Sequence, residues 1–378
     1  MSSALPSPLS VAFDAGPLHG PRTGVGYAVD ALRRALADRV DVAVHDYVLS
    51  FRAELADGTR RLPLPAALAQ RVWGRLDRPS ADRWLRDAHG DPVQLVHGTN
   101  YVVPPTRLPA VVSVYDCWFL EHPELAGAHV RRAGEVLRKA VERGAVVHTS
   151  SHATEAKVRR LFPTAAVCTV HLGPLDAPAV APATPVPELT DRPFVLAIGT
   201  LERRKNLPAL VRAFGALAGG DTEVRLVLAG GPGDDADAVA DAIDALPNGV
   251  ADRVILTGRI DEPIRGWMLR HASVLAYPSL DEGFGFPLLD AMRAGTPVVA
   301  STAGSIPEVA GDAAVLVDAA DEDGLAAALG EVLRNTDRRT ALVTAGDAQW
   351  RTFSWQRCAD EMVHLYRRVV EGDVEGMR

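Results

Sequence analysis

The sequence predicts an α/β protein built from two doubly wound, Rossmann-like domains. Short runs of Val, Ile, Leu and Ala alternate with helical patterns along both halves of the chain. Such continuous apolar runs are typical of parallel strands that are covered by helices on both faces. A Pro- and Ala-rich segment at 175–187 separates the halves and favours a linker over a helix or a central strand. We therefore expect domains at 1–176 and 191–352, a linker at 177–190, and ligands at the carboxyl ends of the strands.

Each half contains six predicted strands. In the first half they cover 10–15, 42–48, 94–97, 110–115, 145–149 and 167–171, and in the second half 194–198, 224–229, 253–256, 274–277, 298–300 and 314–317. Helical patterns cover 28–37, 130–143, 207–218, 236–245 and 324–333. The final segment, 353–371, is amphipathic and needs a surface to pack on. Its apolar face comprises Trp355, Ala359, Met362, Val363 and Tyr366.

The most informative stretch runs from Tyr277 to Pro297 and predicts a strand, a glycine turn and a short helix. Gly283 and Gly285 let the backbone turn tightly and approach a ligand closely. Pro287 suits the first turn of a helix and Gly295 suits its C-terminal cap. We expect the amides of 283–286, which include Phe284 and Phe286, to point from the helix N-terminus toward an anion.

Two carboxylates flank this turn, Glu282 within the loop and Asp290 about two helical turns further on. A phosphate alone would not favour carboxylates beside it. A sugar-nucleotide would, because its phosphates suit the amides and its hydroxyls suit the carboxylates. A capped helix without any ligand is the alternative interpretation.

A basic turn follows the predicted strand 194–198. Arg204 and Lys205 lie at the carboxyl end of that strand, and Asn206 is a plausible N-cap of the next helix. Two cations in such a loop can bind a diphosphate through charge-assisted hydrogen bonds of roughly 1.5–3 kcal/mol each. The alternative is a solvated basic turn, which the glycine turn in the same domain makes less attractive.

Polar residues in the first half give weaker signals. Gly24 and Gly26 open the first predicted helix and only loosely resemble a dinucleotide-binding turn. His97 and the pair Tyr115 and Asp116 end two strands, where they are expected to face a cleft. Each also has a structural alternative: packing for the glycines, a core role for His97, and a loop cap for Asp116.

The sequence offers no strong metal site. Acidic pairs at 235/237 and 321/323 stand where helices begin, and acidic residues are expected there without a metal. The three cysteines, Cys117, Cys168 and Cys358, have no paired spacing, which argues against a disulfide framework or a zinc site and for a reducing cytoplasm. The first residues lack the pattern of a signal peptide.

The charge pattern disfavours general nucleic-acid binding, because the net charge is −8. Residues 1–176 carry +3 and residues 177–378 carry −11, which sum to −8. The helix at 130–143 places four cations close together, interrupted by Glu135 and Glu142. The four are Arg131, Arg132, Arg138 and Lys139. We expect at most weak, salt-sensitive contact with the inner face of a membrane.

Taken together, these motifs resemble the retaining glycosyltransferases of family 4, in the glycosyl transferases group 1, which have the GT-B fold. The similarity covers nearly the whole chain. It rests on GTLERRKNL, DEGFGFPLLDAMRAGTPVVAS, IPEVAGDAAVLVD and the FSW tail, and on GPRTGVGYAV, LVHGTNYVVPP and VVSVYDCWFLEHPE in the first half. The resemblance implies two domains that face a central cleft, with the C-terminal helix crossing back to the first domain.

The resemblance also implies the roles of individual residues. Arg204 and Lys205 would bind the donor pyrophosphate, Glu282 and the loop amides the donor sugar, and Asp290 the ribose. Gly199, Thr200 and Arg259 are assigned to donor binding as well. The family usually has glutamate at 290 and often histidine at 115, so ribose contact and sugar recognition can differ in this chain. A phenol such as Tyr115 cannot serve as a base at neutral pH.

The implied reaction moves a sugar from a GDP-, UDP- or dTDP-sugar to a hydroxyl of a carbohydrate, lipid-linked or small-molecule acceptor. It retains the anomeric configuration and needs neither a metal nor a cofactor, because two cations stabilise the leaving group. The first domain is expected to bind the acceptor and the second the donor. Three alternatives stay open: a nucleotide-sugar epimerase, a non-catalytic nucleotide-sugar or glycan-binding protein, and, less attractive, a dehydrogenase that uses Asp46.

Overall fold

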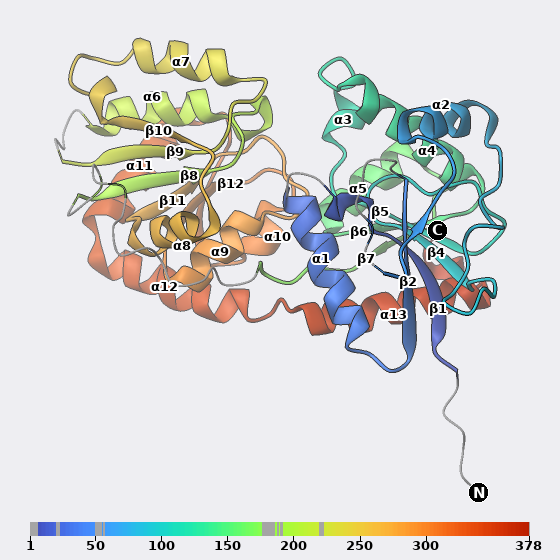
Figure 1. Ribbon diagram of the computed structural model, residues 1–378. Coiled ribbons are helices and arrows are strands. Elements are labelled where there is room, and N and C mark those ends of the chain that lie inside the picture. The colour runs from blue at the N-terminus through green and yellow to red at the C-terminus, as the bar shows by residue number, and fades with distance from the viewer. Residues whose placement is uncertain are drawn as a thin grey trace, which may run out of the picture. The chain divides into compact units, whose positions relative to one another are not determined.

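The computed structural model describes residues 7–19, 23–49, 55, 57–175, 186, 189, 192–218 and 223–377. The chain separates into two units, each a parallel sheet between helices (Figure 1). Unit 1 comprises Met1–Gly173 and Phe353–Arg378, and unit 2 comprises Pro174–Thr352. Most of the predicted linker at 177–190 lies outside the described residues.

The unit 1 sheet has seven strands in the order β3-β2-β1-β4-β5-β6-β7. All its pairings are parallel. The order changes direction between β1 and β4, which makes the carboxyl ends of these two strands the expected ligand edge. The strands are β1 (Leu9–Asp14), β2 (Val42–Val48), β3 (Arg60–Arg61), β4 (Leu95–Gly98), β5 (Ala110–Val114), β6 (Val146–Thr149) and β7 (Val167–Thr169).

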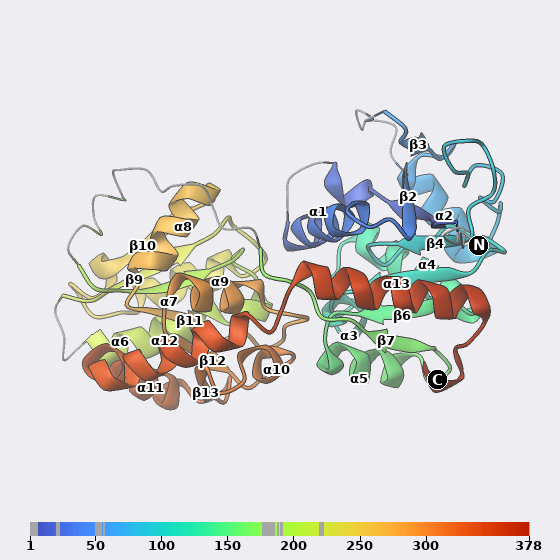
Figure 2. The same cartoon turned by 90° about the horizontal axis from the view of Figure 1, so that it is seen from below.

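Helices cover both faces of the unit 1 sheet (Figure 1). They are α1 (Gly24–Ala37), α2 (Ala66–Leu76), α3 (Trp118–Glu121), α4 (Ala128–Glu142), α5 (His152–Leu161) and α13 (Trp355–Glu371). Although α13 is distant in sequence, it packs beside α1 and against β5 (Figure 2). Ser354 caps its N-terminus, and Gly372 ends it in the left-handed conformation. Its predicted apolar face is buried, except that Trp355 is half-buried.

The unit 2 sheet has six strands in the order β10-β9-β8-β11-β12-β13, again parallel throughout. They are β8 (Phe194–Ile198), β9 (Arg225–Ala229), β10 (Val254–Gly258), β11 (Val274–Tyr277), β12 (Val298–Ser301) and β13 (Ala314–Val317). The order changes direction between β8 and β11. The loops that carry the predicted cations and the glycine turn follow these two strands.

The unit 2 helices are α6 (Leu207–Ala218), α7 (Ala236–Asp244), α8 (Glu262–His271), α9 (Phe286–Ala294), α10 (Ile306–Ala310), α11 (Glu322–Arg334) and α12 (Thr336–Trp350). α6 and α7 lie on one side of the sheet, and α8 and α9 on the other (Figure 1). Val195, Phe214, Leu226 and Val299 are fully buried in the core between the sheet and α6.

The predicted fold class of two parallel α/β units is confirmed, and every predicted strand overlaps an observed one. Only β3 among the strands of the described residues was not predicted. The sequence patterns missed α2, α3, α5, α8, α10 and α12. Within the described residues, no helix combines the length and apolar character needed to cross a bilayer.

Candidate functional site in unit 2

The loops after β8 and β9 approach each other closely at the carboxyl edge of the unit 2 sheet. Gly199 follows β8 with φ 146°, in a conformation that favours glycine. A side chain at Gly230, after β9, would collide with the Gly199 backbone. The short 3₁₀ turn Arg203–Lys205 (η3) comes next and presents the predicted cations.

Arg204 and Lys205 both contact the carboxylate of Glu282. Arg204 Nη1 donates to Oε2 at 2.5 Å, and Lys205 Nζ donates to Oε1 at 2.7 Å. The Glu282 side chain is 6% exposed, that of Arg204 16% and that of Lys205 11%. Both cations are therefore largely shielded from solvent, because a buried carboxylate draws them in.

The electrostatics of this cluster are asymmetric. Two neighbouring cations lower the pKa of Glu282 to about 2, although burial acts in the opposite direction. Burial lowers the pKa of Lys205, and Glu282 opposes that effect only in part, because Arg204 repels the ammonium. Glu282 is therefore ionised at neutral pH, and the cluster as a whole can accept further negative charge.

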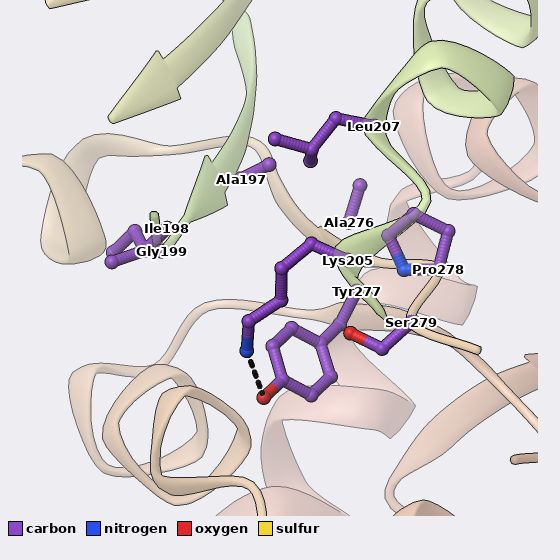
Figure 3. Close-up of a pocket in the computed structure, with 9 residues that line it drawn as sticks. All are labelled: Ala197, Ile198, Gly199, Lys205, Leu207, Ala276, Tyr277, Pro278 and Ser279. Carbon is purple, nitrogen blue, oxygen red and sulfur yellow. Dashed lines mark hydrogen bonds between the residues drawn. The ribbon is translucent and has the colours of Figure 1, made fainter. Parts of the chain in front are cut away.

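Tyr277, the last residue of β11, lies against Lys205 (Figure 3). Its hydroxyl accepts a hydrogen bond from Lys205 Nζ at 3.2 Å, and the ammonium lies 4.9 Å from the centre of its ring. Lys205, Tyr277 and Ser279 line a pocket of about 10 Å³ together with residues of β8. Sequence reasoning missed Tyr277, because an aromatic residue at a strand end has the same pattern as a core residue.

The glycine turn has the predicted local structure. Gly285 has φ 96° and immediately precedes α9, which ends at Gly295 in the left-handed conformation. Gly283 and Phe284 are buried and Phe286 is half-buried. The two phenylalanine rings pack edge to face with centroids 5.3 Å apart. The N-terminus of α9 therefore lies close to Glu282 along the chain, since Glu282 comes three residues before Gly285 at the helix start.

Asp290 is buried on α9 and belongs to an ion network. Its Oδ2 accepts from Arg265 Nη1 at 2.6 Å, and Arg293 Nη2 lies 3.7 Å from Oδ1. Arg265, on α8, also pairs with Glu262 at 2.8 Å. Burial raises the pKa of Asp290, and the arginines oppose this. Oδ1 is buried and has no hydrogen-bond partner among the described residues.

The remaining predicted donor residues are at the same edge of the sheet. Thr200 follows Gly199 and is half-buried, whereas Arg259 is exposed just after β10. The Arg259 side chain lies over Gly231, where any larger residue would meet it. Asn206 does not act as the predicted N-cap: its amide donates to the carbonyls of Pro278 and Ala319.

The predicted residues of unit 1 have mostly structural contacts. Gly24 begins α1, and Gly26 N donates to the Thr23 side chain at 3.3 Å. Asp116 is half-buried, and its Oδ1 accepts from the Trp118 amide at 3.1 Å. The hydroxyl of Tyr115 is buried, and no described residue forms a hydrogen bond of normal geometry with it. Burial raises the pKa of Tyr115, and nearby Ser113 offsets part of this effect.

His97 does not face a cleft, contrary to expectation, because it is completely buried in a chain of hydrogen bonds. Tyr366 lies 2.7 Å from its Nδ1, and Ser113 lies 2.8 Å from its Nε2. Ser113 also contacts His148 Nδ1 at 2.8 Å, and His148 Nε2 lies 3.2 Å from the Val170 carbonyl. The network joins α13 to β4, β5 and β6. It could not be predicted from the sequence, since its members are far apart along the chain.

The proton positions in this chain follow from its last acceptor. The Val170 carbonyl can only accept, so His148 carries its proton on Nε2 and accepts from Ser113. Ser113 in turn accepts from His97 Nε2, and His97 Nδ1 accepts from Tyr366. Burial lowers the pKa of both histidines, to about 4 for His148, which keeps them neutral.

Two further sequence interpretations can be compared with the structure. Asp321 caps α11 by accepting from the Gly324 amide, as predicted for a helix start, and Asp235 directly precedes α7. Asp46 is bound by Arg33 at 2.7 and 2.9 Å. This ion pair with Arg33 disfavours the dehydrogenase alternative, in which Asp46 would bind a ribose.

The family match described next lies within unit 2, the unit that carries this site. Residues 192–335 match the family model described as glycosyl transferases group 1. The chain is 26% identical over 385 residues to the O-antigen chain mannosyltransferase B of Escherichia coli, which covers 95% of this chain and 100% of the relative.

Solved structures agree with the fold. A sucrose-phosphate synthase from Thermosynechococcus elongatus superposes with a TM-score of 0.71 at 21% identity, covering 96% of this chain and 99% of that one. The Anabaena protein Alr3699/HepE, solved in complex with UDP and glucose, superposes with a TM-score of 0.68 at 16% identity, covering 95% and 99%. At these identities the likeness shows the fold alone.

Proposed function

The chain is a glycosyltransferase whose residues 192–335 belong to the glycosyl transferases group 1 family, and we propose that unit 2 binds its nucleoside-diphosphate-sugar donor. The sugar is then transferred to an acceptor hydroxyl with retention of configuration. One observation carries the proposal: two cations converge on one buried carboxylate beside the N-terminus of α9.

The chemistry follows from the charge that develops during transfer. When the bond between sugar and phosphate breaks, the diphosphate gains negative charge, and prepositioned cations stabilise that charge most effectively. Arg204, Lys205 and the amides of 283–286 supply this stabilisation in the proposal. Glu282 binds hydroxyl groups of the donor sugar. The leaving phosphate accepts the proton of the acceptor hydroxyl, which attacks on the same face of the sugar.

The remaining contacts are assigned by chemistry and by family resemblance. Asp290 offers Oδ1 to the ribose, and Gly199, Thr200 and Arg259 line the donor site. The complex of HepE with UDP and glucose favours testing uridine nucleotides first. The acceptor, a carbohydrate, lipid-linked or small-molecule hydroxyl, is assigned to unit 1. We also propose a cytoplasmic location, in keeping with three free cysteines.

A thermal-shift screen tests the donor proposal. UDP, GDP, dTDP and their sugar conjugates are each added in excess, since a ligand at 100 times its Kd stabilises the folded state by about 2.7 kcal/mol. At least one diphosphate should raise the Tm more than its monophosphate. A transferase should release sugar from the stabilising donor to water or to an acceptor, whereas a binding protein should not. Analysis of the products distinguishes a transferase from an epimerase. If no diphosphate stabilises the protein, the proposal fails.

Activity should not depend on a divalent metal. Arg204 and Lys205 already provide two positive charges for the diphosphate, and stabilising charge on a phosphoryl oxygen is one of the roles of a catalytic metal ion. We expect release of the nucleoside diphosphate to continue in excess EDTA at its normal rate. Complete loss with EDTA that Mn²⁺ or Mg²⁺ restores would contradict the assignment of the cations.

Membrane contact should be weak and salt-sensitive. On α4, Lys139 pairs with Glu142 at 2.6 Å, and Arg138 lies over the ring of Phe162. The Lys139–Glu142 pair reduces the attraction to anionic lipid, which is about 1 kcal/mol for each Lys or Arg near the surface. Co-sedimentation with phosphatidylserine vesicles should be slight at low salt and absent at high salt. Tight binding in high salt would instead indicate a lipid-linked acceptor.

A further inference from the structure

The Lys205 ammonium is held from two directions. It has three N–H donors, of which one points to Glu282 Oε1 at 2.7 Å and another to the Tyr277 hydroxyl at 3.2 Å. The third has no hydrogen-bond partner within the described part of the chain. Because the three bonds of an ammonium are tetrahedral, fixing two of them fixes the direction of the third.

The surroundings of Lys205 keep it in this position. Its Cε would lie 3.2 Å from a side chain at Gly199, so the lysine passes over the bare backbone of the β8 loop. Its ammonium also lies 4.9 Å from the centre of the Tyr277 ring, a favourable cation–π distance. Tyr277 is 2% exposed and is carried by a central strand, so its own position is rigid.

Tyr277 can orient the ammonium without neutralising it. Burial and the charge of Glu282 raise the pKa of Tyr277 well above its usual value, so the phenol stays protonated and its oxygen acts only as an acceptor toward Lys205. Glu282, in contrast, is an anion that competes with a phosphate for the same ammonium. Tyr277 therefore supplies direction, whereas Glu282 supplies charge.

We propose that Tyr277 is a positioning residue that aims the third Lys205 N–H at the β-phosphate of the donor. The proposal rests on the proposed function, because it requires that Lys205 bind the diphosphate. The proposal adds Tyr277 to the donor site as a residue whose side chain contacts Lys205 and not the substrate. It also predicts that Tyr277 matters only for ligands that have a β-phosphate.

The test compares diphosphates with monophosphates in variants of the full chain. Kd values for UDP, UMP, GDP and GMP are measured by calorimetry for the native protein, Tyr277→Phe, Lys205→Ala and the double variant. Phenylalanine keeps the ring in its buried space and removes only the hydroxyl. Arg203→Ala, in the same turn but exposed, is the matched control.

The native protein should bind UDP or GDP more tightly than the monophosphate. Tyr277→Phe should weaken diphosphate binding about five- to tenfold, the effect of losing one hydrogen bond, and change monophosphate binding less than twofold. In the Lys205→Ala background the same substitution should have no further effect. A merely structural role would weaken both ligands equally and persist without Lys205.

The outcomes separate the two proposals. If the native protein does not prefer a diphosphate, or if Lys205→Ala keeps that preference, the proposed function of the cations is wrong and this inference falls with it. If Lys205→Ala removes the preference but Tyr277→Phe preserves it, the donor site stands and the role of Tyr277 is wrong. Thermal unfolding of each variant verifies that it is folded at the assay temperature.

Discussion

Replacing Lys205 or Arg204 with alanine should lower the turnover of the donor by roughly 10²–10³-fold, the usual cost of losing one group that stabilises developing charge. Both side chains contact Glu282 beside the glycine turn, and in the proposed mechanism each meets the leaving diphosphate. Release of the nucleoside diphosphate is the measurement. Arg203→Ala, which removes an exposed cation from the same turn, should have nearly normal turnover.

These two variants should also be less stable than the native protein. Removing one member of a buried ion pair costs about 3–5 kcal/mol, because it leaves a charge without compensation. The loss should lie at or below the lower end of that range, since Glu282 keeps its second cation in either variant. Urea unfolding of each variant measures the loss. Normal turnover in both variants, with unchanged stability, would contradict the assignment of the cluster.

Replacing Tyr366 with alanine should destabilise unit 1 by about 3–5 kcal/mol, the range for removing a buried aromatic side chain. Tyr366 is fully buried and joins α13 to the sheet through His97. Tyr366→Phe keeps the ring but leaves the His97 acceptor unpaired, which should cost about 1–3 kcal/mol. Urea unfolding followed by Trp fluorescence measures both losses.

The matched control for this prediction is on the same helix. His364 is exposed on α13, so His364→Ala should change the stability by less than about 0.5 kcal/mol. If Tyr366→Ala costs no more than this control, α13 does not contribute to the stability of unit 1 in the way that the network indicates. A loss in Tyr366→Ala with none in Tyr366→Phe would indicate packing alone.

Much of the fold could be predicted from the sequence, because its signals are local. Buried parallel strands are continuous apolar runs, and the glycines at 285 and 295 mark both ends of α9 through their backbone conformations. The amphipathic face of α13 likewise depends only on spacing along one helix. Helices such as α12 were missed because their apolar residues form no strong stripe, so tertiary contacts rather than periodicity maintain them.

The sequence by itself determined which loops carry the candidate site, since Arg204, Lys205 and Glu282 each follow a predictable strand. Only the tertiary structure decided how these groups meet. It paired both cations with Glu282, placed Tyr277 against Lys205, and bound Asp290 to Arg265. It also buried His97, which strand position alone had suggested as a ligand contact. The physical reason is that charge pairing and desolvation depend on distances between segments far apart in the chain, which no local pattern encodes.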